Sequence, residues 1–245
     1  MRKEPHFTPE KIVSMLGIKA GSLGSIALIP GPKERSQMLL STLQHPAKSF
    51  SFLDYEMYTG TRNGKRVTVG NGGRYAPDTA ITTEILCAGG VQNLIRIGSC
   101  GSLQEKVKIG DLIIVTGTVR GEGTTPYYVP QNHSTVSHPE IINALIEAAE
   151  NLGARFHLGW VFTTDALFQE TPELLHQLAQ QGISGIDMVT SAFLTVAQVR
   201  QKKAGAILAV SDECLQGKLG FRDPCFLDAE EKMVEVALRA IDFLK

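Results

Sequence analysis

The chain has 245 residues, of which 43% are hydrophobic and 20% charged, and this ordinary globular composition excludes a disordered or fibrous protein. Twenty-four basic and twenty-five acidic side chains leave a formal net charge of −1, so bulk charge favours neither nucleic acid nor an anionic membrane as a partner. An anion that binds here must be held by a few placed residues. The length fits one large α/β domain or two small ones.

The four cysteines, at positions 87, 100, 214 and 225, form no CxxC pair and no His/Cys cluster at metal-ligand spacing. Reduced thiols and no metal site are therefore expected. The first twelve residues lack the apolar run of a secretory signal, and no stretch of about twenty apolar residues could cross a bilayer. These features predict a cytoplasmic protein.

Short apolar runs rich in β-branched residues predict strands that are buried on both faces. They cover residues 25–30, 66–70, 93–99, 111–119, 157–164 and 204–212. Helical patterns lie between them, at residues 32–43, 76–90, 138–153, 171–182 and 187–203, and several end in Gly, as helix C-termini prefer. The alternation, without a linker or repeat, predicts a single α/β domain over residues 1–245, built as a layered sheet.

The last helix carries a start signal and an apolar stripe. Asp228 is expected to cap it, with Glu231 three residues further on, as in a capping box. Six apolar side chains at helical spacing then face the core. They are Met233, Val236, Ala237, Ala240, Ile241 and Leu244.

Polar residues at strand exits, which follow the ends of the predicted strands, are candidate ligand-binding residues, because ligands of open α/β sheets bind beyond the carboxyl ends of strands. The first predicted strand ends in Pro30 and Gly31 and runs into a helix start that contains Arg35. Exposed amides and this cation suit an anion. A Pro/Gly turn before a surface arginine is also ordinary helix-start chemistry, so this exit alone does not assign a site.

The second exit contains a charged residue, Arg96, in the middle of an apolar strand. Burying an unpaired guanidinium costs on the order of several kcal/mol, so Arg96 must meet an anion or a carboxylate. Ser99 and the backbone amides beside the hinges Gly98 and Gly101 offer further donors that suit phosphate. The alternative is a structural arginine paired with Glu84 of a neighbouring helix, and the residues alone leave both possibilities open.

The third exit places Asp212 at the end of an apolar strand. Apolar surroundings would raise the pKa of this carboxyl and let it act as a general acid. A turn or helix-capping aspartate is the more common alternative.

In their order and spacing, these three exits resemble the nucleoside phosphorylase family, which includes hexameric-type purine nucleoside phosphorylase, uridine phosphorylase and related nucleosidases. The likeness runs from about His6 to the C-terminal helix. Its most specific segment is residues 94–130, followed by residues 58–69 and 204–213. The resemblance implies a single three-layer α/β/α domain around a central mixed sheet.

The resemblance also implies roles for individual residues. It makes Gly31, Arg35, Arg96 and Ser99 the site of inorganic phosphate, the co-substrate, with no metal or organic cofactor. Asp212 matches the purine-type acid that protonates the leaving base, and Arg222 matches the arginine that swings toward that acid. The residues expected to contact the nucleoside are His6, Leu167, Phe168, Asp187 and Met188, together with Arg74, which departs from the family pattern. His6 would reach the ribose 5′-hydroxyl in a neighbouring subunit, which implies a dimer-based assembly, possibly a hexamer.

Several positions depart from the family pattern, and they cluster around the sugar. Val189 stands where the family has a glutamate that grips the ribose hydroxyls, and valine accepts no hydrogen bond. Arg74 and Tyr75 place bulky side chains where small residues back the sugar. Leu53 falls where a neighbouring subunit's arginine reaches the phosphate.

The function predicted from these features is phosphorolysis of a nucleoside to free base and ribose 1-phosphate, with purine ahead of uridine because of Asp212. One alternative is altered specificity, in which Arg74 restores the lost charge or binds an acidic substrate. Another is a family member that has lost catalysis and binds nucleoside or phosphate. A nucleosidase that uses water is the third, and Arg35 and Arg96 count against it, because a hydrolase has no phosphate to hold.

Overall fold

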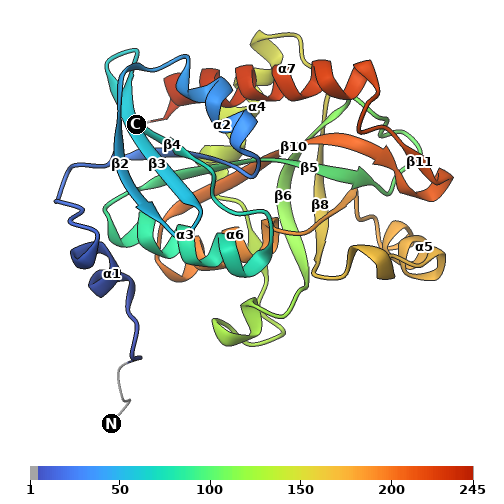
Figure 1. Cartoon of the computed structure of the whole chain (residues 1–245). Helices are drawn as coiled ribbons and strands as arrows, with labels where there is room; N and C mark the ends of the chain where they lie inside the picture. Colours follow the sequence, from blue (N-terminus) through green and yellow to red (C-terminus); the bar gives the residue numbers. More distant parts are fainter. Residues whose placement is uncertain (1–4, 245) are drawn as a thin grey trace.

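The apolar runs of the sequence form strands that pair into one mixed sheet in this computed structural model, which describes residues 5–244 (Figure 1). The strands are β1 (Ile26–Pro30), β2 (Gln44–Phe52), β3 (Tyr55–Arg62), β4 (Lys65–Gly70), β5 (Asn93–Ser102), β6 (Leu112–Gly121), β7 (Thr135–Val136), β8 (Phe156–Thr164), β9 (Gly185–Asp187), β10 (Lys203–Glu213) and β11 (Lys218–Leu219). The helices are α1 (Pro9–Met15), α2 (Lys33–Leu40), α3 (Ala76–Ala88), α4 (Pro139–Asn151), α5 (Pro172–Gln180), α6 (Thr190–Val199) and α7 (Pro224–Ala240).

The pairing of the strands places three carboxyl ends together. β1 pairs in parallel with β4 and β5, and β5 pairs in parallel with β10. β5 also pairs antiparallel with β9, and β9, β8, β6 and β10 follow one another in pairs, so that these five strands close into a ring. Because β1, β5 and β10 run in one direction, the three polar exits reach the same edge of the sheet.

Helices cover both faces of this sheet (Figure 1). On one face, α2, α4 and α7 pack against a cluster that includes Ile95 and Ile97 of β5. On the other, α1, α3 and α6 pack against a cluster that includes Leu94, because side chains alternate along a strand. The predicted three-layer α/β/α architecture with a mixed sheet is confirmed.

The six side chains of the predicted stripe are all buried, as expected, although α7 ends at Ala240 and Ile241 and Leu244 lie beyond it. The predicted cap is wrong. The helix α7 begins at Pro224, and Asp223 caps it by accepting a hydrogen bond from the Cys225 amide at 2.9 Å, while Asp228 lies one turn inside. Proline at the first helical position fixes this start, because its backbone angle already suits a helix and it has no N–H to satisfy.

The sequence patterns did not predict the elements α1, β2, β3, β7, β9 and β11. The side chains of β2 are mostly exposed, so this edge strand lacks the apolar pattern that marks a buried one. The prediction that residues 1–245 form one domain stays a prediction, and residues 1–4 and 245 lie outside the described part of the chain. No helix within residues 5–244 has both the length and the apolar character needed to span a membrane.

Candidate functional site

A cavity of about 680 Å³ opens where the carboxyl ends of β5 and β10 meet the turn after β1. Ten of the twelve residues that the sequence singled out line it, although they come from segments far apart in the chain. They are Gly31, Arg35, Arg74, Arg96, Ser99, Leu167, Phe168, Asp187, Met188 and Asp212.

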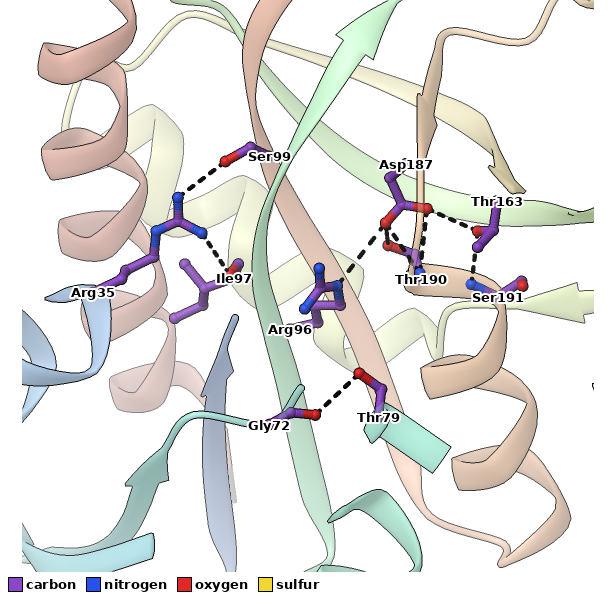
Figure 2. Close-up of polar contacts among 10 residues, drawn as sticks. All are labelled: Arg35, Gly72, Thr79, Arg96, Ile97, Ser99, Thr163, Asp187, Thr190 and Ser191. Carbon is purple, nitrogen blue, oxygen red and sulfur yellow. Dashed lines mark hydrogen bonds and ion pairs between the residues drawn. The ribbon is translucent and has the colours of Figure 1, made fainter. Parts of the chain in front are cut away.

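The guanidinium of Arg35 enters the site from α2 and is fixed by three acceptors. Its Nη1 donates to the Ile97 carbonyl at 3.0 Å, and its Nη2 donates to Ser99 Oγ at 2.9 Å (Figure 2). The same Nη2 also donates to the carboxylate of Glu230 on α7. Arg35 is 4% exposed, and its buried Nε has no hydrogen-bond partner among the described residues.

Arg96 comes from the other face of the sheet, on β5. The alternative pairing with Glu84 is wrong, because Glu84 binds Arg200 instead. Asp187 is the carboxylate near Arg96, with its Oδ2 4.0 Å from Nε (Figure 2). The guanidinium packs so closely over Gly98 that a Cβ there would lie 3.1 Å from Nη2.

The electrostatics of Arg96 point to an anion. Burial lowers the pKa of Arg96 to about 10, the charge of Asp187 opposes this, and the charge of Arg35 lowers the pKa further. Arg96 therefore remains a cation at neutral pH. Its Nε and Nη1 are buried without a hydrogen-bond partner within residues 5–244. Buried donors are rarely left unpaired, so two arginines with free donors on one cavity wall suit a bound anion.

Asp187 is held by the start of α6. Its Oδ1 accepts from Thr163 Oγ1 at 2.8 Å, and its Oδ2 accepts from the Thr190 amide at 3.0 Å (Figure 2). Its carboxylate thus serves as a helix cap and as the counter-ion of Arg96, and a contact with nucleoside stays a prediction. Met188 and Val189 follow it on the cavity wall, where Val189 is 2% exposed.

Asp212 is aimed into the cavity by an irregularity in β10. The register of β10 against β5 shifts between Val210 and Asp212, and such a bulge re-aims a side chain. Its carboxylate accepts from Ser211 Oγ at 2.6 Å and from Cys214 Sγ at 3.2 Å. The neighbouring strand leaves room because a Cβ at Gly101 would lie 2.5 Å from Asp212 Oδ2.

A third carboxyl lines the cavity besides those of Asp187 and Asp212: Glu170, which sequence reasoning missed. It is partly buried two residues after Phe168 and has no hydrogen bond or ion pair among the described residues. Burial, followed by the negative charge of Asp212, raises the pKa of Glu170 to about 7. This carboxyl can therefore hold a proton near neutral pH. The signal available in the sequence was its place two residues after Phe168, which was predicted to contact the nucleoside.

Two predicted site residues do not line this cavity. His6 is exposed beside Phe7, before α1, and Arg222 is exposed in the turn before α7. Of the two bulky side chains that the family resemblance places where small residues are expected, Arg74 lines the cavity. Tyr75 instead lines an adjoining cavity together with Leu53, and the two cavities share Gly31 and Arg74.

Comparison with known proteins places the chain in a family. Residues 25–244 match the family model described as the phosphorylase superfamily. The chain belongs to this superfamily. A uridine phosphorylase of Thermococcus kodakarensis is 34% identical over 83% of this chain and 78% of its own length. A purine nucleoside phosphorylase DeoD-type of Roseobacter denitrificans is 30% identical over 92% of this chain and 97% of its own length.

Solved structures show the same phosphorylase-superfamily fold. The purine nucleoside phosphorylase of Toxoplasma gondii in complex with immucillin-H has a TM-score of 0.83 at 26% identity, covering 89% of this chain and 90% of its own. The uridine phosphorylase of Vibrio fischeri has a TM-score of 0.84 at 23% identity, covering 92% and 95%. The family model and the relatives of 30 to 34% identity confirm the family that the sequence resembles.

Proposed function

We propose that this protein catalyses phosphorolysis of a purine nucleoside to the free base and ribose 1-phosphate, with uridine a poorer substrate. The observation that carries the proposal is the pair of buried arginines, Arg35 and Arg96, which reach one cavity from opposite faces of the sheet with donors left unpartnered. Curated relatives with identities of 30 to 34% are named as phosphorylases of both uridine and purine nucleosides. Membership of the family therefore supports the reaction class, and the choice of base rests on the site.

In the proposed reaction, phosphate sits against Gly31, Arg35, Arg96 and Ser99. One phosphate oxygen forms a bond to the anomeric carbon as the glycosidic bond breaks. The electron pair of the glycosidic bond leaves with the base. The two guanidinium groups position the phosphate dianion and balance its charge, which lowers the barrier most when they are fixed in advance. Asp212 gives the departing base a proton. Arg222, which lies outside the cavity in this structure, would have to swing toward Asp212 to assist, as the family resemblance implies.

The proposed preference for a purine rests on two carboxyl side chains in the cavity. Asp212 and Glu170 both line it, beside Leu167 and Phe168. A purine leaves more readily when its imidazole ring takes up a proton, and a carboxyl that is protonated near neutral pH can supply one. The raised pKa of Glu170 supports a role for this carboxyl as a proton donor next to Asp212.

Self-association completes the proposed site. His6 is exposed and lies outside the cavity of its own chain, as expected for a residue that reaches a neighbouring subunit. We therefore propose a dimer-based assembly. We also propose that the protein acts in the cytoplasm, with phosphate and nucleoside as its small-molecule partners and no metal or organic cofactor. Residues 5–244 contain no group of three or more His, Cys, Asp or Glu side chains placed to hold a metal ion.

One observation favours a second candidate, a binding protein without catalysis. Val189 lines the cavity where the family resemblance expects a carboxylate for the ribose hydroxyls. Leaving two hydroxyls desolvated without a partner costs about 1–3 kcal/mol each. Arg74, on the same cavity wall, is the side chain available to replace that contact or to bind an acidic substituent.

Incubation with inosine, adenosine and uridine, with and without phosphate, tests the proposal. Base release that depends on phosphate and is fastest with a purine supports it. Release without phosphate indicates a nucleosidase, and no release indicates the binding protein. The Asp212→Asn variant should lose at least tenfold in purine turnover, whereas Asp228→Asn, exposed on α7, should not. Equal turnover of the two variants would remove the assigned role of Asp212.

The Val189→Glu variant tests the ribose half of the site. If the missing carboxylate limits activity, this change should lower KM for the nucleoside, because it restores an acceptor for the ribose hydroxyls. An unchanged KM would show that another group, such as Arg74, already binds the sugar.

A further inference from the structure

Glu230 is the carboxylate that touches the proposed phosphate site from outside the cavity. It lies on α7 and binds Arg35 Nη2, yet it does not line the cavity that Arg35 faces. Its side chain is 26% exposed, whereas that of Arg35 is 4% exposed. The ion pair therefore joins a buried cation to a carboxylate that approaches it from the helix side.

This contact determines which donors of Arg35 remain for a ligand. A guanidinium has five N–H donors. The two on Nη2 are directed to Ser99 and Glu230, and one on Nη1 is directed to the Ile97 carbonyl. Two donors remain, one on Nη1 and one on Nε, and the Nε is buried without a hydrogen-bond partner. The head group is thus held in one orientation before an anion arrives.

The same contact also changes the charge of the cavity. Both buried arginines of the site have a carboxylate neighbour, Glu230 for Arg35 and Asp187 for Arg96. Each of the two positive charges is therefore partly offset before phosphate enters. A dianion meets a weaker field than two unpaired arginines would provide.

We propose that Glu230 is a positioning residue that sets the affinity for phosphate, by holding the head group of Arg35 and by offsetting its charge. The inference rests on the proposed function, because it concerns the same anion site. The two effects have opposite signs. Orientation favours phosphate binding, whereas the negative charge opposes it.

Two substitutions separate these effects. Glu230→Gln keeps an acceptor of the same size and removes the charge, so phosphate should bind about three- to tenfold more tightly than to the wild type. Glu230→Ala removes both the acceptor and the charge, so Arg35 loses an anchor. It should bind phosphate more weakly than Glu230→Gln does.

The experiment measures binding of inorganic phosphate to the full chain by titration calorimetry, at fixed ionic strength. Glu231→Gln is the matched control, because Glu231 is exposed on the same helix and has no contact with the site. Thermal unfolding of each variant checks the fold. In turnover assays, the effect of Glu230→Gln should fall on KM for phosphate far more than on kcat, which a merely structural role would not produce.

Unchanged or weaker phosphate binding in Glu230→Gln would overturn the inference, as would equal binding by the Gln and Ala variants. The outcome is separable from that of the proposed function. If the variants bind phosphate as expected and no nucleoside is cleaved, the role of Glu230 stands and phosphorolysis fails. If neither the wild type nor Glu230→Gln binds phosphate, both fail.

Discussion

At the residue scale, two glycines that lack a Cβ atom determine where the charged side chains of the cavity lie. The strand β5 carries glycine at positions 98 and 101, where other side chains approach the backbone: Arg96 packs against the first, and Asp212 approaches the second. A side chain at either position would occupy the space that the guanidinium or the carboxylate uses. The two glycines therefore place the charges of the site as directly as the charged residues do.

Gly101→Ala should displace Asp212. The added Cβ would lie 2.5 Å from Asp212 Oδ2 and 2.3 Å from Cys214 Sγ, so both side chains must move. We expect at least a tenfold loss of purine turnover, with phosphate binding by calorimetry preserved, because neither Arg35 nor Arg96 is among the atoms nearest the added Cβ. Gly123→Ala, whose Cβ would make ordinary contacts only, is the control. Full turnover in Gly101→Ala would contradict this account of Asp212.

Glu170 should make stability depend on pH. Its pKa rises from the ordinary value of 4.5 to about 7 on folding, so folding favours the protonated form. The stability gained from this group is complete below about pH 4.5 and is lost as pH rises through 7. Glu170→Gln should therefore match the wild type at about pH 4. At about pH 8 it should exceed the wild type in free energy of unfolding by about 1–2 kcal/mol, a figure reduced for solvent screening.

Denaturant unfolding at these two pH values measures the effect of Glu170. Glu105→Gln, on an exposed carboxyl outside the cavity, is the control and should not reproduce the trend. A constant difference between Glu170→Gln and the wild type at both pH values would show that this carboxyl does not titrate as described.

At the scale of the element, α7 joins stability to the site. Its apolar stripe fills the core on one face of the sheet, while Glu230, on the same helix, binds Arg35. Where the helix starts therefore matters for function. The capping contact of Asp223 and the proline after it fix that start, and the position of Glu230 follows from it.

Asp223→Ala should cost about 1 kcal/mol of unfolding free energy, because the amide of Cys225 loses its acceptor. Asp228→Ala, the residue that the sequence pattern favoured as the cap, should cost less than about 0.5 kcal/mol, as exposed substitutions usually do. Thermal and denaturant unfolding of the pair decide between the two caps. An equal loss in both variants would argue against the capping contact of Asp223.

At the scale of the whole molecule, the sheet gathers charges that lie far apart in the chain. Arg35, Arg96 and Asp212 meet because β1, β5 and β10 run in parallel and end at one edge. The helices on the two faces then deliver Arg35 from one side and hold the partner of Arg96, Asp187, on the other. An anion in this cavity bridges both halves of the fold.

Inorganic phosphate should therefore stabilise the whole protein. At about one hundred times its dissociation constant, a ligand of the folded state adds about 2.7 kcal/mol, which corresponds to a rise in Tm of about 5–10 °C for a chain of this size. Differential scanning with phosphate, and with chloride at equal ionic strength as the control, measures this rise. Equal shifts in the two salts would indicate general ionic effects and count against a phosphate site.

The sequence by itself determined the alternating strands and helices, the three-layer class, the family and ten residues of the cavity wall. These features depend on local periodicity and on motifs at strand ends, and both can be recognised in the sequence without knowledge of the fold. Edge strands such as β2 escaped, because their side chains lack the apolar pattern. The helix cap was misplaced, because Asp223 and Asp228 both precede an apolar stripe.

Only the tertiary structure decided which charges pair. Arg96 lies near Asp187 and away from Glu84, and Arg35 binds Glu230, a residue 195 positions further along the chain. The raised pKa of Glu170 likewise depends on its burial beside Asp212. The physical reason is the same in each case. The strength of an ion pair and the pKa of a group depend on the distance to other charges and on desolvation. Folding sets both, because it brings together residues that lie far apart in the sequence.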